Sequence, residues 1–103
     1  MTYKLIISDR AEEHIGNIIR YVAVELSNPT AAKAIIADIE KGYSKLEFMV
    51  DSLALCQDPY LSQKGYRKYI LDEHDYVILY KVEKKKVYIS GVFHMKEDYA
   101  NKL

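Results

Sequence analysis

Residues 66–94 read YRKYILDEHDYVILYKVEKKKVYISGVFH. Three runs rich in Tyr, Val and Ile lie at residues 65–71, 76–82 and 86–94, and the short polar segments DEHD and EKK separate them. Aromatic and β-branched residues favour strands, and short polar breaks between such runs favour tight turns. This part of the chain therefore predicts a three-stranded antiparallel meander, against which the remaining elements must pack.

The stretch before the meander predicts two helices. Apolar residues recur with helical spacing from residue 9 to about residue 27, and a second stripe runs from residue 29 to about residue 50. Asn28-Pro29 marks the second start, because Asn caps free N–H groups and Pro has none at the first helical position. So short a junction predicts an antiparallel helical hairpin. The two stripes are Ala11, Ile15, Ile18, Ile19, Val22 and Leu26, and Ala32, Ile35, Ile36, Ile39, Tyr43, Leu46 and Val50.

Shorter segments complete the prediction. Residues 2–7 predict a strand, and Ser8 after it is of the N-cap type. Residues 52–64 predict a loop, with a helical extension at its start as an alternative. Gly42 costs about 1 kcal/mol against Ala within a helix and indicates a close crossing. The order strand, helix, helix and three strands predicts an α+β fold in which the helical hairpin packs on one face of a small sheet.

Composition limits the class of protein. The chain has 103 residues, 50% of them hydrophobic, with two Pro and four Gly, which predicts one globular domain over residues 1–103. One cysteine allows no intramolecular disulfide. No run approaches the ~18–20 apolar residues of a membrane span, and no signal peptide pattern opens the chain, so we expect a cytoplasmic protein without membrane contact.

Charge is balanced overall but not along the chain. Fifteen basic and fifteen acidic side chains cancel, yet residues 1–59 carry six basic against nine acidic residues, and residues 60–103 carry nine against six. A polyanion is therefore expected to contact the carboxy-terminal half. The run Lys84-Lys85-Lys86 is interpreted as a solvated turn, with a patch that binds a nucleic-acid backbone as the alternative.

The order and spacing of several short motifs resemble a known family. These are Ser8–Ala11 at the first helix start, LSNPTAA between the helices, YRKY and YVILY in two strands, and the ending VFHMKEDY at residues 92–99. Across essentially the whole chain they resemble the RelE/ParE superfamily of bacterial type II toxin–antitoxin toxins. The resemblance implies a toxin held inactive by a cognate protein antitoxin encoded nearby.

Two activities occur in that superfamily. RelE-like toxins cut mRNA on the ribosome, and ParE-like toxins poison DNA gyrase. We expect the first of these activities: a metal-independent endoribonuclease (mRNA interferase) that cuts mRNA on the ribosome and so inhibits translation. RNA cleavage needs an activated 2′-hydroxyl, cationic stabilisation of phosphorane charge and protonation of the leaving oxygen. The resemblance assigns catalytic roles to Arg67, His94 and Tyr99, and substrate binding to Lys64, Lys68 and Lys96.

The sequence also departs from the family pattern. RelE-like chains commonly carry Arg directly after the last His, and ParE-like chains often carry it three places after; here the residues are Met95 and Glu97. Lys96 supplies charge without the planar fork of Arg. A gyrase poison, which needs a binding surface rather than a catalytic set, and a degenerate module that binds antitoxin without toxicity remain as alternatives.

Other sites are not expected. Three His and one Cys stand at no metal-ligand spacing, and the chain has no Gly-rich phosphate loop, so we expect neither metal nor cofactor. His14 is predicted to lie at the surface or rim. Because the first helical stripe must face the sheet, the antitoxin is expected on the remaining sheet face and edge, where an acidic segment would neutralise Arg67 and Lys68.

Overall fold

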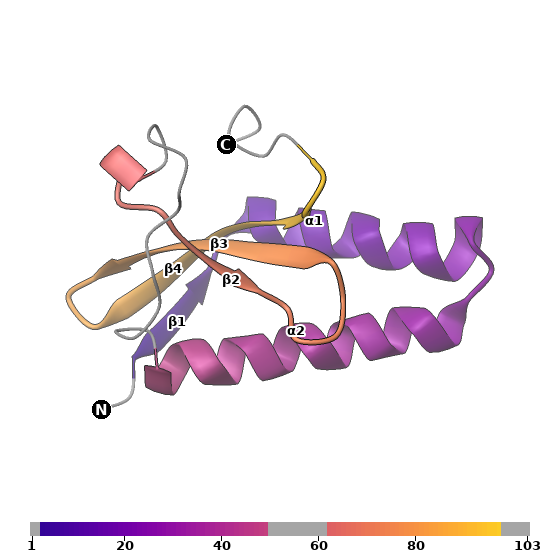
Figure 1. Cartoon of the computed structure of the whole chain (residues 1–103), viewed down its shortest axis with the longest axis horizontal. Helices are drawn as coiled ribbons and strands as arrows, with labels where there is room; N and C mark the ends of the chain where they lie inside the picture. The colour runs from indigo at the N-terminus through magenta and orange to yellow at the C-terminus, as the bar shows by residue number, and fades with distance from the viewer. Residues whose placement is uncertain (1–2, 50–61, 98–103) are drawn as a thin grey trace.

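The computed structural model describes residues 3–49 and 62–97 and contains a helical hairpin packed on a four-stranded sheet (Figure 1). Within these residues no helix is long and apolar enough to cross a membrane. In chain order the elements are β1 (Lys4–Ile7), α1 (Asp9–Arg20), the π-helical turn η1 (Tyr21–Glu25), α2 (Pro29–Met49), β2 (Arg67–Ile70), β3 (Tyr76–Glu83) and β4 (Lys86–His94).

Both helices begin where the capping residues predict. The Ser8 side chain accepts a hydrogen bond from the Ala11 N–H at 3.0 Å, and the Asn28 side chain accepts one from the Ala31 N–H at the same distance. Each cap satisfies an N–H group that has no partner inside its helix. The predicted helical hairpin is confirmed.

The first helix is shorter than predicted. Regular α-helix ends at Arg20, and residues 21–25 widen into η1, closed by a hydrogen bond from the Leu26 N–H to the Tyr21 carbonyl at 3.0 Å. Ser27 then adopts a positive φ of 49°. The apolar spacing alone could not show this change, because a π-turn inserts a residue without ending the helix.

The sheet order is β1-β4-β3-β2, with β1 parallel to β4 and the other pairs antiparallel. The meander is confirmed, and β4 has the predicted bounds. Strand β2 is shorter than the predicted 65–71, and β3 extends one residue beyond 82. The predicted loop at 52–64 lies mostly outside the described residues, and so does its helical alternative.

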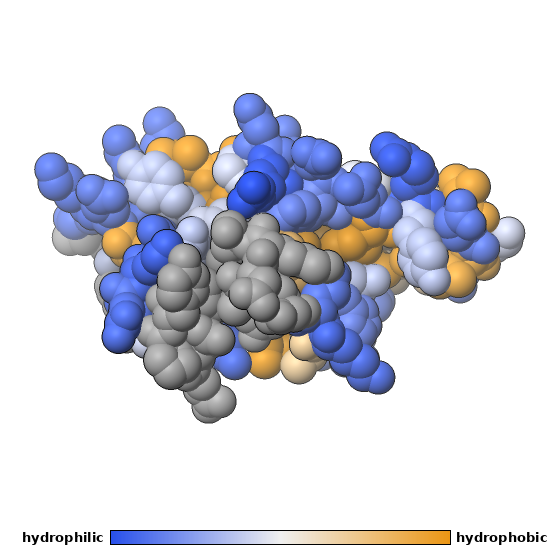
Figure 2. Space-filling model, turned by 90° about the horizontal axis from the view of Figure 1, so that it is seen from above, coloured by the Kyte–Doolittle hydropathy of each residue, from blue (hydrophilic) through white to orange (hydrophobic). Residues whose placement is uncertain are grey.

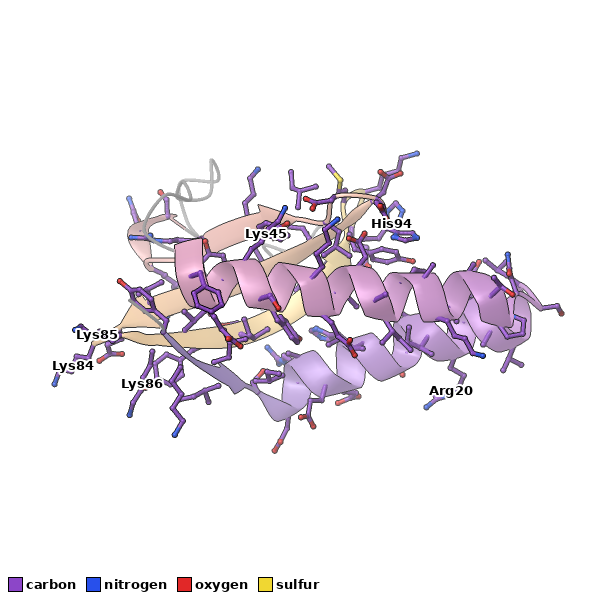
Figure 3. The ribbon with its side chains drawn as sticks, turned by 90° about the horizontal axis from the view of Figure 1, so that it is seen from below. Arg20, Lys45, Lys84, Lys85, Lys86 and His94 are labelled. Carbon is purple, nitrogen blue, oxygen red and sulfur yellow. The ribbon has the colours of Figure 1, made fainter. Side chains whose placement is uncertain are left out.

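Seen from below, both helices lie over the sheet (Figure 3). The first helical stripe faces this core as predicted: Val22 is buried, and Ile15, Ile18 and Ile19 pack against the buried cluster. At Gly42 a Cβ atom would lie 3.0 Å from the Tyr69 ring, which confirms the predicted close crossing of α2 over the sheet.

A polar clasp joins α2 to the turn between β2 and β3. Asp38, whose side chain is 1% exposed, accepts hydrogen bonds at Oδ2 from the Glu73 N–H at 3.0 Å and from His74 Nδ1 at 2.8 Å. Asp72 in the same turn accepts from Lys45 at 2.6 Å and from the Tyr69 hydroxyl at 2.9 Å. The Lys45 and Tyr69 hydrogen bonds hold the pKa of Asp72 below its usual range.

Candidate functional site

A free edge on β4 begins where its pairing with β1 ends. Strand β1 pairs with residues 86–89 of β4, so residues 90–94 have no neighbouring strand on that side among the described residues. The last backbone bond before this edge comes from Ser8, whose N–H donates to the Ile89 carbonyl at 3.1 Å. Further along, His14 Nδ1 accepts from the Val92 N–H at 3.3 Å and Glu97 Oε1 accepts from the His94 N–H at 3.0 Å. Side chains thus replace the missing strand.

His14 is held firmly in this position. Its ring lies 4.6 Å from the Phe93 ring, centroid to centroid. A Cβ atom at residue 91 would lie 2.7 Å from the Phe93 ring and 3.0 Å from His14 Nδ1, so only Gly lets both rings approach the strand. The sequence predicts His14 at the surface or rim; the structure places it half-buried on α1, facing β4.

Two adjoining pockets, which we call the α1–β4 groove, lie along this edge. The first has a volume of about 280 Å³ and the second about 370 Å³. Asn17, Ile18 and Glu97 line both pockets and join them. The remaining lining residues are His14, Val92 and Phe93 in the first pocket, and Tyr21, Tyr76 and His94 in the second.

His94 lies at the end of β4, with hydrogen bonds that define its tautomer. Its Nδ1 accepts from the Lys96 N–H at 3.1 Å, so the neutral ring carries its proton on Nε2. The ring stands edge-on to Tyr76 with centroids 5.3 Å apart. In this arrangement Nε2 can donate a hydrogen bond to a ligand but has no lone pair with which to act as a base.

Tyr76 and Glu97 set the electrostatics of the second pocket. Burial raises the pKa of Tyr76, and the carboxylate of Glu97 and the phenol of Tyr21 add to the rise. Tyr76 therefore stays a neutral hydrogen-bonding group at physiological pH. A carboxylate beside it makes this part of the groove unfavourable for an anion.

The other predicted site residues are dispersed. Arg67 pairs with Tyr80 on β3, four residues after Tyr76, and Tyr76 pairs with His94 on β4. With strands about 4.8 Å apart and about 3.3 Å of rise per residue, the Cα atoms of Arg67 and His94 are roughly 16 Å apart. The structure therefore does not bring Arg67 and His94 together at one point.

The predicted lysines also occupy separate places. Lys68 lines a small pocket with Ile70, Val77 and Met95, and strand alternation points it away from the face of Arg67. Lys64 precedes β2 and Lys96 follows β4, both exposed. Tyr99 lies outside the described residues.

Sequence reasoning missed the groove residues His14 and Tyr76. The one signal available was the Gly at position 91 inside a strand pattern, since such a glycine often marks a close approach. In the part of the chain that the structure describes, no three His, Cys, Asp or Glu side chains gather as a metal site.

Two comparisons with known proteins cover most of the chain. Residues 5–99 match the family described as the ParE toxin of the type II toxin–antitoxin system, parDE. A solved structure titled "Chromosomal ParDE TA system from P. aeruginosa" contains a similar chain, with a TM-score of 0.75 and 18% identity over 92% of this chain and 98% of that chain. A search of curated proteins returns no match. At that identity the structural likeness bears on the fold, whereas the family match bears on the kind of protein.

Proposed function

Because the chain belongs to the ParE toxin family of type II toxin–antitoxin systems, we propose that it is a toxin that poisons DNA gyrase. The observation that carries the proposal is the family match over residues 5–99. Membership implies a cognate antitoxin as partner. That the target is DNA gyrase is our proposal, and two features of the described residues support this target.

The first support is the dispersal of the expected catalytic set. An endoribonuclease must place a base, a cation and an acid around one phosphate. Arg67 and His94 lie at separate points of the sheet. A gyrase poison needs no such convergence.

The second support is an exposed apolar surface at the end of the helical hairpin, which we call the hairpin tip: Tyr21, Val24 and Leu26. Their exposed fractions are 55%, 66% and 55%. Figure 2 shows orange, hydrophobic residues at this protruding end, and η1 lies within it. Exposed apolar clusters mark protein-binding sites, and π-turns are frequent at functional positions.

The test measures gyrase directly. Purified chain is added to gyrase and supercoiled plasmid, and trapped cleaved DNA and loss of supercoiling are followed. We expect both effects, and we expect Val24→Lys to weaken them at least tenfold. Phe48→Lys is the matched control, because Phe48 is also exposed (65%) but lies on the last turn of α2. Gyrase unaffected by the wild-type chain would remove the proposal.

The ribosome-dependent mRNA endonuclease is the second candidate. It draws on the family-like positions of Arg67, Lys68 and His94, with Lys64, Lys96 and Tyr99 as further proposed site residues. Inducing the chain without antitoxin while pulse-labelling protein and DNA synthesis separates the two targets. Early loss of methionine incorporation, abolished by replacing Arg67 and His94 together, would establish the endonuclease. If neither synthesis falls, the chain is a non-toxic antitoxin-binding module.

The antitoxin contact is proposed at β2. Among the described strands β2 is an outer one, with a neighbour on one side, and such an edge accepts an added strand. Arg67 and Lys68 give it positive charge suited to an acidic segment. Reversing both charges with Arg67→Glu and Lys68→Glu should reduce antitoxin affinity at least tenfold; unchanged affinity would exclude this edge.

A further inference from the structure

The turn between β3 and β4 combines positive charge with an unfavourable backbone. Lys84 and Lys85 have φ angles of 48° and 65°, both in the left-handed region. Glu83 pairs with Lys86, so this is a two-residue hairpin loop. Such loops strongly prefer Asn-Gly or Asp-Gly, because both central residues need positive φ. Two lysines are among the less suitable residues for these positions.

Strand β1 brings a fourth lysine to the same place. Lys4 is the register partner of Lys86 in the parallel pair, and the Lys4 N–H donates to the Lys85 carbonyl at 3.1 Å. Like charges on paired residues of neighbouring strands are destabilising. Three features at this corner of the sheet are therefore locally unfavourable: the positive φ of Lys84, the positive φ of Lys85, and the like-charged pair of Lys4 and Lys86. Each of them places a lysine there.

These four residues, Lys4, Lys84, Lys85 and Lys86, form what we call the lysine corner. All four are exposed, and none makes a side-chain hydrogen bond or ion pair with another described residue. Glu83 is the one carboxylate within the turn itself. Figure 3 shows Lys84, Lys85 and Lys86 projecting outward at one end of the sheet, with His94 at the other end.

We propose that the lysine corner is a binding site for the phosphate backbone of duplex DNA. Lysine ammonium groups that are exposed and unpaired can neutralise phosphates and release the counterions condensed on the duplex. The backbone strain fits a functional origin, because strained residues persist where the conformation serves a contact. The zero net charge of the whole chain does not oppose this, since the positive charge is concentrated at one corner.

The surroundings favour a duplex over a single strand. Single-stranded nucleic acids are held by aromatic side chains on which bases stack, combined with cations. The turn residues 83–86 include no aromatic side chain, and Tyr66 nearby along the sheet is covered by the Lys81 ammonium, 4.4 Å from the ring centroid. The turn itself offers ammonium groups and no aromatic ring, which suits it to phosphates and therefore to binding without sequence preference.

The test uses the purified chain and a fluorescein-labelled 20-base-pair DNA of arbitrary sequence, with anisotropy measured at 50, 100 and 200 mM KCl. We expect a Kd on the order of 10⁻⁶–10⁻⁴ M, the usual range for non-specific binding. Three to four phosphate contacts predict a slope of log K against log salt near −3, which is roughly a 60-fold loss between 50 and 200 mM.

One double variant removes the charge while improving the turn. Lys84→Asn with Lys85→Gly installs the preferred loop residues, so the fold is retained and any loss of binding is due to charge. We expect at least tenfold weaker binding at 50 mM KCl and a slope reduced by about 2. Arg20→Gln with Lys33→Gln removes the same charge elsewhere, and Figure 3 shows Arg20 far from the lysine corner. This control should bind within twofold of wild type.

Four outcomes would overturn the proposal. They are no wild-type binding at 50 mM KCl, a loss in the control equal to that in the turn variant, unchanged binding by the turn variant, and tighter binding of single-stranded RNA of equal length. Because DNA is the sole probe in the main measurement, its result does not depend on whether the chain acts on gyrase or the ribosome.

Discussion

Asp38→Ala should destabilise the fold by about 2–3 kcal/mol. The buried Oδ2 accepts two hydrogen bonds, from the Glu73 N–H and His74 Nδ1. Hydrogen bonds to a charged group contribute about 1.5–3 kcal/mol each, so their loss alone would cost about 3–6 kcal/mol. The wild-type protein also bears the cost of burying a carboxylate whose Oδ1 has no partner among the described residues. Asp38→Ala removes this cost, so the net loss of stability is smaller, about 2–3 kcal/mol.

Thermal unfolding followed by circular dichroism measures this difference. At about 4–8 °C per kcal/mol for a domain of this size, Asp38→Ala should lower Tm by roughly 10–20 °C. Asp38→Asn retains one acceptor and should lose about half as much. Glu73→Gln is the control, because its exposed side chain lies in the same turn and should change stability by no more than about 0.5 kcal/mol. A Tm change under 2 °C in Asp38→Ala would refute the assignment of the clasp as a stabilising contact.

The remaining predictions concern other parts of the molecule. Lys84→Asn with Lys85→Gly should raise stability by about 1–2 kcal/mol in urea unfolding, because Asn and Gly adopt the positive φ angles of this turn at a lower cost than Lys. Gly91→Ala should cost about 1–3 kcal/mol in the same assay and displace the His14 ring resonances in NMR, because the new methyl group overlaps Phe93. Burial raises the pKa of Tyr43 to about 12, so its contribution is complete below the unfolded pKa near 10 and is lost as pH rises to 12. Tyr43→Phe should therefore reduce the loss of stability between pH 10 and 12, and unchanged steepness would contradict the burial argument.

Local patterns predicted the elements well. The apolar spacing, Ser8 and Asn28-Pro29 located both helix starts. The run rich in Tyr, Val and Ile after a polar turn located β4 from Lys86 to His94. These features depend on neighbours within a few residues, so a single sequence contains them. The position of β1 beside β4 depends on a contact more than eighty residues away in the chain, and no local pattern encodes it.

Fewer features of the candidate site than of the fold could be predicted from the sequence. The family resemblance, and not a local pattern, assigns a role to His94, which lines the α1–β4 groove. His14, Asp38 and His74 were not identified as a site or clasp, because each takes its role from a partner far along the chain. Gly91 carried a signal, yet a glycine in a strand shows only that something approaches closely, and not what approaches.

The hairpin tip and the lysine corner lie at opposite ends of the molecule, whose longest extent is 40 Å (Figure 1). Sites this far apart without shared partners contribute additively, so changes at one should leave the other intact. Val24→Lys should then weaken gyrase poisoning at least tenfold while DNA affinity stays within twofold. The Lys84→Asn, Lys85→Gly variant should bind DNA at least tenfold more weakly while remaining folded. A phosphate contact contributes less to binding as the salt concentration rises. If the Lys84→Asn, Lys85→Gly variant weakens gyrase poisoning through a lost DNA contact, the effect should therefore be larger at 50 mM KCl than at 200 mM KCl. A larger effect at 200 mM KCl would show that the DNA contact is not the cause.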